Sequence, residues 1–199
     1  ALLSMAFFGA ITILPLYMQN VLGLPAVEAG LAVLPGSLLM GLLGPTIGRI
    51  YDEYGTRVLL LPGSILASSV LWFFTTSGET TSIWTIAIAQ AFLSIGLAMS
   101  FTPLFSASLG SLEPKFYSYG SAVVGTIQQV AGAAGIALMI AIMSTVTANE
   151  AAAGASELTA GTAGAHAAFL VAALVSVPLI IGAIFIRKPA DSIGGPVGH

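Results

Sequence analysis

The stretch Gly44-Pro-Thr-Ile-Gly-Arg-Ile-Tyr-Asp-Glu-Tyr-Gly-Thr-Arg57 is the densest polar patch in a sequence that is otherwise nearly all apolar. It carries four of the thirteen charged residues (five basic and eight acidic), which are Arg49, Asp52, Glu53 and Arg57. A long apolar run precedes it and another follows it. Because a charged side chain is costly in the hydrocarbon core of a bilayer, the stretch marks a place where two membrane spans meet water.

Composition indicates an all-α polytopic membrane protein. Apolar residues make up 57% of the chain, charged residues 7%, and the mean hydropathy is +1.01, whereas a soluble domain carries about 25% charged residues. The net charge of −3 argues against a nucleic-acid partner. The absence of cysteine excludes disulfides and thiolate metal sites, and with two histidines we expect no metal site.

The length accommodates six spans of about 20 apolar residues each. We expect them at about 2–22, 29–50, 58–76, 83–109, 119–147 and 167–186, so that residues 1–188 form one six-helix bundle and 189–199 a flexible cytoplasmic tail. The stretch 148–165 is predicted to be an external loop, with a partly helical loop as the alternative. The chain opens at Ala1 directly in an apolar run without the basic region of a signal peptide. We therefore expect it to be a piece of a longer chain.

Charge placement predicts the topology. With six spans, all five basic residues fall on one side of the membrane, namely Arg49, Arg57, Lys115, Arg187 and Lys188. The other side receives Glu28, Glu79, Glu150 and Glu157. The positive-inside rule makes the basic side cytoplasmic, with both chain ends on that side of the cell membrane.

The sequence also repeats itself weakly. Leu14-Pro-Leu-Tyr17 is echoed by Thr102-Pro-Leu-Phe105, and Gly30-Leu-Ala-Val33 by Gly120-Ser-Ala-Val123. A shift by three spans inverts the orientation in the membrane, so the echoes favour a 3+3 inverted repeat, which is a construction used by transporters.

The pattern Gly48-x-x-x-Asp52-x-x-Gly55-x-Arg57 resembles the loop signature of the major facilitator superfamily. Here Gly48 with Gly44 would allow close helix packing, Asp52 would accept hydrogen bonds from a helix N-terminus, and Gly55 would form a tight turn. Arg57 would pair with Asp52 or with lipid phosphate. The resemblance implies that this loop gates the cytoplasmic side. The match departs at Glu53 and Thr56, and an ordinary solvated loop is the alternative.

A longer resemblance connects the chain with the C-terminal half of the fourteen-helix drug:proton antiporter family. Its blocks are Leu14–Gly23, Ala29–Gly36, Tyr117–Ala122 and Gln128–Gly135. The resemblance implies alternating access, export of lipophilic compounds by proton-coupled antiport, and an N-terminal transmembrane half as partner. The coupling acids would lie in that half, with the proton motive force in place of any cofactor. Many relatives read Arg-Gln where this chain has Gln128-Gln129.

The middle of every predicted span lacks ionisable residues, so the candidates for a substrate pathway are neutral. They are Tyr17, Gln19, Asn20, Gln90, Gln128 and Gln129. A polar side chain in hydrocarbon either bonds a neighbouring helix or lines a wet cavity. Because Gln128 and Gln129 point about 100° apart on a helix, we expect one to face the substrate and the other to join two helices. Five aromatic side chains could contact flat lipophilic substrates, although lipid or core packing is the alternative for each; they are Phe7, Phe8, Phe92, Phe101 and Phe105.

Two other functions are alternatives to a transporter half. A rhomboid-like intramembrane protease would need a nucleophilic serine and a histidine within a late span. The chain has no Gly-x-Ser-x-Gly, and His166 is predicted at an external helix end, so we expect no enzyme. A self-sufficient six-span transporter or channel that acts as a dimer remains open. In either case membrane lipid and a small lipophilic substrate are the expected partners.

Overall fold

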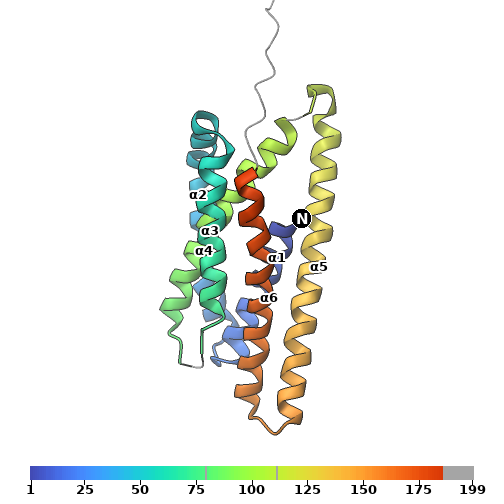
Figure 1. Ribbon diagram of the computed structural model, residues 1–199. Helices are drawn as coiled ribbons and strands as arrows, with labels where there is room; N and C mark the ends of the chain where they lie inside the picture. The colour runs from blue at the N-terminus through green and yellow to red at the C-terminus, as the bar shows by residue number, and fades with distance from the viewer. Residues whose placement is uncertain (79, 111, 186–199) are drawn as a thin grey trace, which may run out of the picture.

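A computed structural model describes residues 1–78, 80–110 and 112–185, and within these ranges the chain is all-helical (Figure 1). Residues 79, 111 and 186–199, which include the predicted tail and the pair Arg187–Lys188, lie outside the described residues. The elements are α1 (Leu2–Asn20), α2 (Ala26–Tyr54), α3 (Thr56–Phe74), α4 (Ile83–Gly110), the 3-10 turn η1 (Pro114–Phe116), α5 (Tyr117–Ala152) and α6 (Glu157–Phe185). All six α-helices are long and apolar enough to cross a membrane, which confirms the predicted fold class.

Local sequence explains where several helices begin and end. Gly23, with φ of 65°, and Pro25 separate α1 from α2. At the start of α4 the Ser82 hydroxyl accepts the Trp84 N–H at 3.3 Å. At the start of α6 the Ser156 hydroxyl accepts the Thr159 N–H at 3.2 Å. These hydroxyls satisfy amide groups that a first helical turn leaves without a backbone partner.

Helix α5 is much longer than a bilayer requires. Its 36 residues extend about 54 Å at 1.5 Å per residue, against a hydrocarbon thickness of about 30 Å. The hairpin between α5 and α6 consequently extends past the neighbouring turns (Figure 1). The partly helical alternative for residues 148–165 is therefore confirmed, because α5 continues to Ala152 and α6 starts at Glu157.

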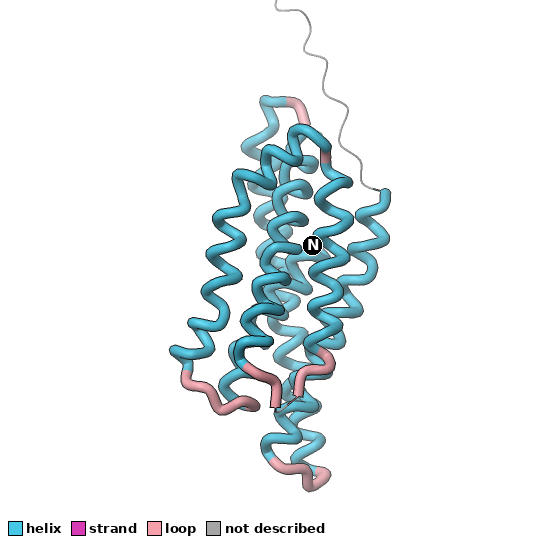
Figure 2. The backbone as a smooth tube through the Cα atoms, turned by 90° about the vertical axis from the view of Figure 1, so that its left-hand side faces the viewer, coloured by secondary structure: helices cyan, strands magenta, loops and turns pink. Residues whose placement is uncertain are grey.

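The six helices form two groups of three, shown from two directions in Figures 1 and 2. Helix α1 packs on α5 and α6, while α4 packs on α2 and α3. Contacts between α3 and α6 join the groups, and there the Ser176 hydroxyl donates to that of Ser68 at 2.7 Å. Exchanging α1 with α4, α2 with α5 and α3 with α6 reproduces most of these pairings, as an inverted repeat requires. The pair α5–α6 packs more extensively than α2–α3.

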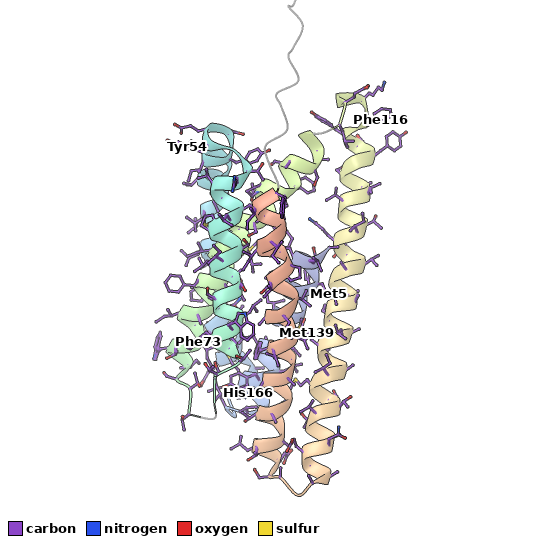
Figure 3. The ribbon with its side chains drawn as sticks, viewed as in Figure 1. Met5, Tyr54, Phe73, Phe116, Met139 and His166 are labelled. Atoms are coloured by element: carbon purple, nitrogen blue, oxygen red, sulfur yellow. The ribbon has the colours of Figure 1, made fainter. Side chains whose placement is uncertain are left out.

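Helices α1 and α5 approach one another through small residues. A Cβ built on Gly132 would lie 2.6 Å from the Phe8 ring, and one on Gly9 would lie 2.5 Å from the sulfur of Met139. A Cβ on Gly135 would collide with the backbone carbonyl of Met5. Met5 and Met139 accordingly lie beside this contact in Figure 3. Here glycine allows the two backbones to come together, as small residues do in membrane helix pairs.

The charged side chains of the described residues lie at the two ends of the bundle. The basic end contains Arg49, Arg57 and Lys115 at the α2–α3 and α4–α5 connections, together with Asp52, Glu53 and Glu113. The acidic end contains Glu28, Glu150 and Glu157 at the α1–α2 and α5–α6 connections, and no Lys or Arg of the described residues. The spans alternate in direction between these ends (Figure 1), so the described basic residues share one side of the membrane.

Candidate functional site

The predicted gating segment consists of two helix ends rather than a loop. Helix α2 continues through Arg49 and Asp52 to Tyr54, and α3 starts at Thr56. A single residue, Gly55, joins them with φ of 82° and ψ of −177°. This conformation is essentially restricted to glycine, so the expectation of a tight turn at Gly55 is confirmed. Arg57 and Asp52 are exposed at the basic end.

The expected close helix packing at Gly44 and Gly48 is wrong for the described bundle. A Cβ built on either glycine would meet no atom within 4 Å. The GxxxG spacing therefore leaves a shallow face on α2 instead of contacting a neighbouring helix of this chain. The gating role of Gly48, Asp52, Gly55 and Arg57 stays a prediction.

One concavity between α4 and α5, which we call the polar groove, combines aromatic rings with polar side chains. We define it by Phe101, Thr102, Phe105 and Ser106 of α4 and Gln128 of α5, which enclose about 310 Å³. A second hollow of about 220 Å³ shares Phe101, Phe105 and Gln128 and extends to Leu3 and Ser4 of α1. Three helices thus meet around one amide, at the half of the bundle nearer the basic end.

The lining of the polar groove combines aromatic rings with free hydrogen-bonding groups. Thr102 and Ser106 lie one helical turn apart and present hydroxyls on the same face of α4. Within the described part of the chain no side-chain hydrogen bond involves Thr102, Ser106 or Gln128. Phe101 also packs edge-on against Phe7 of α1, with ring centroids 5.6 Å apart. Such a surface suits a ligand that has flat apolar parts and a few polar atoms.

A comparison with models of protein families identifies the family of this chain. The model described as Major Facilitator Superfamily matches residues 1–198. The chain belongs to the major facilitator superfamily. It is therefore a multi-pass membrane protein of a transporter superfamily, and the resemblance drawn from its motifs is confirmed.

Several relatives of this superfamily member are named for drug resistance. It is 39% identical over 189 residues to the lincomycin resistance protein LmrB of Listeria monocytogenes, covering 92% of this chain and 40% of the relative. The LmrB of Bacillus subtilis is 36% identical over 190 residues with the same coverage. A multidrug resistance protein B homolog of Mycobacterium tuberculosis is 28% identical over 144 residues, 71% of this chain and 27% of the relative. The chain thus spans about two fifths of the length of the LmrB relatives.

The structure places the two adjacent glutamines of this superfamily member differently. Gln128 is half-buried and lines the polar groove, whereas Gln129 is exposed on α5. The expectation that the pair divides between two faces agrees with this geometry. Gln129 makes no side-chain hydrogen bond to another helix among the described residues, so the expectation that it joins two helices stays a prediction.

Tyr17 and Gln90, two predicted pathway residues, are instead buried in the helix packing. Tyr17 is fully buried against Phe169, with ring centroids 6.2 Å apart, and its hydroxyl donates to the Gly78 carbonyl at 2.7 Å. Gln90 is 1% exposed, and neither atom of its amide has a hydrogen-bond partner among the described residues. Its backbone lies against Gly36 of α2, where an added Cβ would be 3.1 Å from the Gln90 carbonyl oxygen. Neither side chain lines an open groove.

Gln19 and Asn20 lie at the acidic end of α1 and are exposed. Gln19 donates to the Pro15 carbonyl of its own helix at 3.3 Å. Asn20 lines a different hollow of about 470 Å³ between α1 and α5, which also contains Ser144 and Thr147. Ser144 follows Gln128 by sixteen residues, which turns the two about 160° apart around α5. The hollow at Asn20 and the polar groove therefore lie on opposite flanks of the α1–α5 contact and do not form one channel.

Sequence reasoning missed Thr102, Ser106 and Ser4 as lining residues. A signal for the first two was present, because two hydroxyls four residues apart interrupt an apolar helix. Their approach to Gln128 comes from helix packing, which no local pattern encodes.

Proposed function

We propose that the chain is the C-terminal half of a secondary active multidrug exporter, which exchanges lipophilic or amphiphilic compounds for protons by alternating access. The observation that carries the proposal is the polar groove, where one unpaired amide and two hydroxyls lie beside two phenylalanine rings. The resistance names of the relatives support the substrate class, and lincomycin is the first compound to test.

The proposed N-terminal partner is supported by two exposed apolar stripes. On α2 the stripe consists of Leu31, Leu34, Leu38 and Leu42, and on α5 it consists of Tyr119, Val123, Ile127 and Val130. These are the two least buried of the six helices. We propose that a second helix bundle covers them, with the polar groove facing the interface between the two halves.

In this proposal the residues that couple transport to protons lie in the N-terminal half. The charged residues of the described bundle lie at its ends. His166 of α6 lies beside the α3–α4 turn and is bonded through Nε2 to the Ser77 carbonyl (Figure 3). Since a carbonyl only accepts, that nitrogen carries the proton, and His166 acts as a structural donor. We further propose that the basic end is cytoplasmic, following the charge bias.

The experiment compares efflux by this chain alone with efflux by a chain that carries the additional upstream spans. Cells are loaded with ethidium, and lincomycin resistance is measured in parallel. We expect proton-dependent efflux from the longer chain only. In that chain Gln128→Ala should impair export, whereas Gln129→Ala should leave it near the parent value. Efflux from the 199-residue chain alone would instead support the dimeric half-size transporter, and equal effects of the two substitutions would count against the polar groove.

A further inference from the structure

The aromatic wall of the polar groove is supported by a side chain that does not line the groove. Phe101 of α4 contributes its ring to the lining, and Phe7 of α1 packs edge-on against that ring, with centroids 5.6 Å apart. Phe7 itself lines neither the polar groove nor the adjoining hollow that extends to Ser4. Its ring therefore acts on the groove only through Phe101.

Phe7 is held in turn by the contact between α1 and α5. The centroid of its ring lies 5.2 Å from that of Phe8. The Phe8 ring fills the space that Gly132 leaves open on α5, where an added Cβ would be 2.6 Å from it. Gly132 follows Gln128 by one helical turn, so the two residues share a face of α5. The three rings thus connect the α5 surface beside Gln128 with the α4 wall of the same groove.

The α4 wall needs this support because its backbone is interrupted at the groove. Pro103 lies inside α4, two residues after Phe101. Since proline has no N–H, the Met99 carbonyl loses its helical partner and α4 can bend at this point. Direct contact between α4 and α5 is also limited compared with the contacts that each helix makes elsewhere. The rings of Phe7 and Phe8 therefore supply a restraint that the α4 backbone does not.

We propose that Phe7 is a positioning residue that sets the width of the polar groove, and with it the size of the compounds that the groove admits. Without the Phe7 ring, Phe101 can turn into the vacated space and away from the groove, which leaves more room beside Gln128. As a determinant of exported size, Phe7 depends on the proposed exporter function. The width of the groove is measurable without transport, so failure of the positioning role and failure of the exporter function give different results.

The width is measured with Ser106→Cys, whose thiol lies in the groove and is the only one in the protein, because the natural sequence has no cysteine. In native membranes its labelling rates are compared for the small N-ethylmaleimide and the bulky fluorescein-5-maleimide. We expect Phe7→Ala to raise the bulky-to-small rate ratio about two- to tenfold, which is the population change that loss of one edge-on ring contact allows. Phe7→Tyr, which retains the ring, should keep the parent ratio.

Phe92→Ala is the matched control, because Phe92 is exposed on α4 and lines neither hollow, so its removal should leave the ratio unchanged. In a separate F7A protein, the buried Ser100→Cys should stay unlabelled before denaturation, which separates a wider groove from an unfolded bundle. If F7A does not fold, Phe7→Leu keeps apolar bulk without the ring, and the ratio should change in the same direction. An unchanged ratio, an equal rise in F92A, or no labelling of S106C by the small reagent would overturn the proposal.

A second measurement uses the longer chain that carries the upstream spans. Relative to lincomycin, F7A should raise the resistance to a bulkier compound such as erythromycin, and F92A should not. Unchanged relative resistance in an active F7A exporter would overturn the role of Phe7 in substrate size. If the parent exports neither compound, the exporter function fails, whereas the labelling ratio still decides whether Phe7 sets the width of the groove.

Discussion

The hydroxyl of Tyr17 in α1 donates to the backbone carbonyl of Gly78 at 2.7 Å, across 61 residues of sequence. The same turn between α3 and α4 receives His166 of α6, which is bonded to the Ser77 carbonyl. The ring of Tyr17 packs edge-on against Phe169, which in turn stacks on Phe74 at 5.2 Å. Two helices from one half of the bundle thus fix a turn that belongs to the other half. This contact closes the acidic end around α1.

Removing the Tyr17 hydroxyl should cost a modest amount of stability. Tyr17→Phe keeps the ring between its aromatic neighbours but leaves the Gly78 carbonyl with only the Thr81 N–H, at 3.1 Å, as a donor. Hydrogen bonds between membrane helices are worth about 0.6 kcal/mol on average, which corresponds to a fall of about 1–2 °C in melting temperature for a chain of this size. Differential scanning fluorimetry of the detergent-purified protein measures it. Tyr119→Phe, at a side chain that is 73% exposed, should cause no change, and equal melting temperatures for the two variants would contradict the role of this bond.

The junction between α2 and α3 should tolerate only glycine. Gly55 has φ of 82° and ψ of −177°, a combination that strains a residue with a Cβ by about 1–3 kcal/mol. Gly55→Ala should therefore lower the thermal stability. Gly44→Ala is the matched control, because it lies within α2 where a Cβ meets nothing within 4 Å. Alanine favours a helix over glycine by about 0.5–1 kcal/mol, so G44A should be neutral or stabilising. A G44A variant as unstable as G55A would contradict this account.

Two glycines of α5 that look alike in the sequence should respond differently to substitution, because only one of them lies at the contact with α1. A Cβ at Gly135 would collide with the Met5 backbone, whereas a Cβ at Gly125 would enter open space. Because the obstacle is backbone rather than a flexible side chain, Gly135→Ala must separate the helices, at an overpacking cost of about 1–3 kcal/mol. Gly125→Ala should be tolerated. The readout is the yield of folded protein and its melting temperature, and equal behaviour of the two variants would contradict the close approach.

The polar groove should be accessible to water, whereas the buried face of the same helix should not. Ser106 lines the groove, while Ser100 is fully buried and donates to the Gly96 carbonyl at 2.8 Å. Ser106→Cys should therefore react with a small water-soluble maleimide in membranes, and Ser100→Cys should react only after denaturation. The natural absence of cysteine makes both variants single-thiol proteins. If S106C were as protected as S100C, the groove would be closed in the membrane.

The fold was predictable because its strongest signals are local. Long apolar runs and interrupting polar patches define six spans, and the Gly55 signature identified a conformation that the structure shows. Helix ends were less predictable, since α5 and α6 continue through an Ala-rich stretch that resembles a loop in hydropathy but favours a helix by propensity. The prediction that Gly44 and Gly48 pack closely on a neighbouring helix is wrong within the described bundle. Small residues at this spacing allow close contact, but they do not ensure that a neighbouring helix is present.

The candidate site was only partly predictable, for a reason specific to membrane helices. In α4 and α5 apolar and small polar side chains are spread around the whole helix, so hydropathy does not reveal which face is buried. Gln90 and Gln128 therefore looked equivalent in the sequence, although one is enclosed by neighbouring helices and the other lines a groove. The sequence predicts Tyr17 as a pathway residue, since its hydrogen-bond partner Gly78 lies 61 residues away and no local pattern reveals the pairing. Thr102 and Ser106 gained significance only when α5 brought Gln128 beside them.

The orientation of the bundle is tested by two exposed positions at opposite ends. Ser118 lies in the first turn of α5 at the basic end, and Ala153 lies in the α5–α6 hairpin at the acidic end. Membrane-impermeant maleimide applied to intact cells should label Ala153→Cys and spare Ser118→Cys, because the basic end is expected to face the cytoplasm. Permeabilised cells should show both thiols labelled, which controls for local reactivity. The reverse pattern in intact cells would place the basic residues outside the cell and contradict the predicted topology.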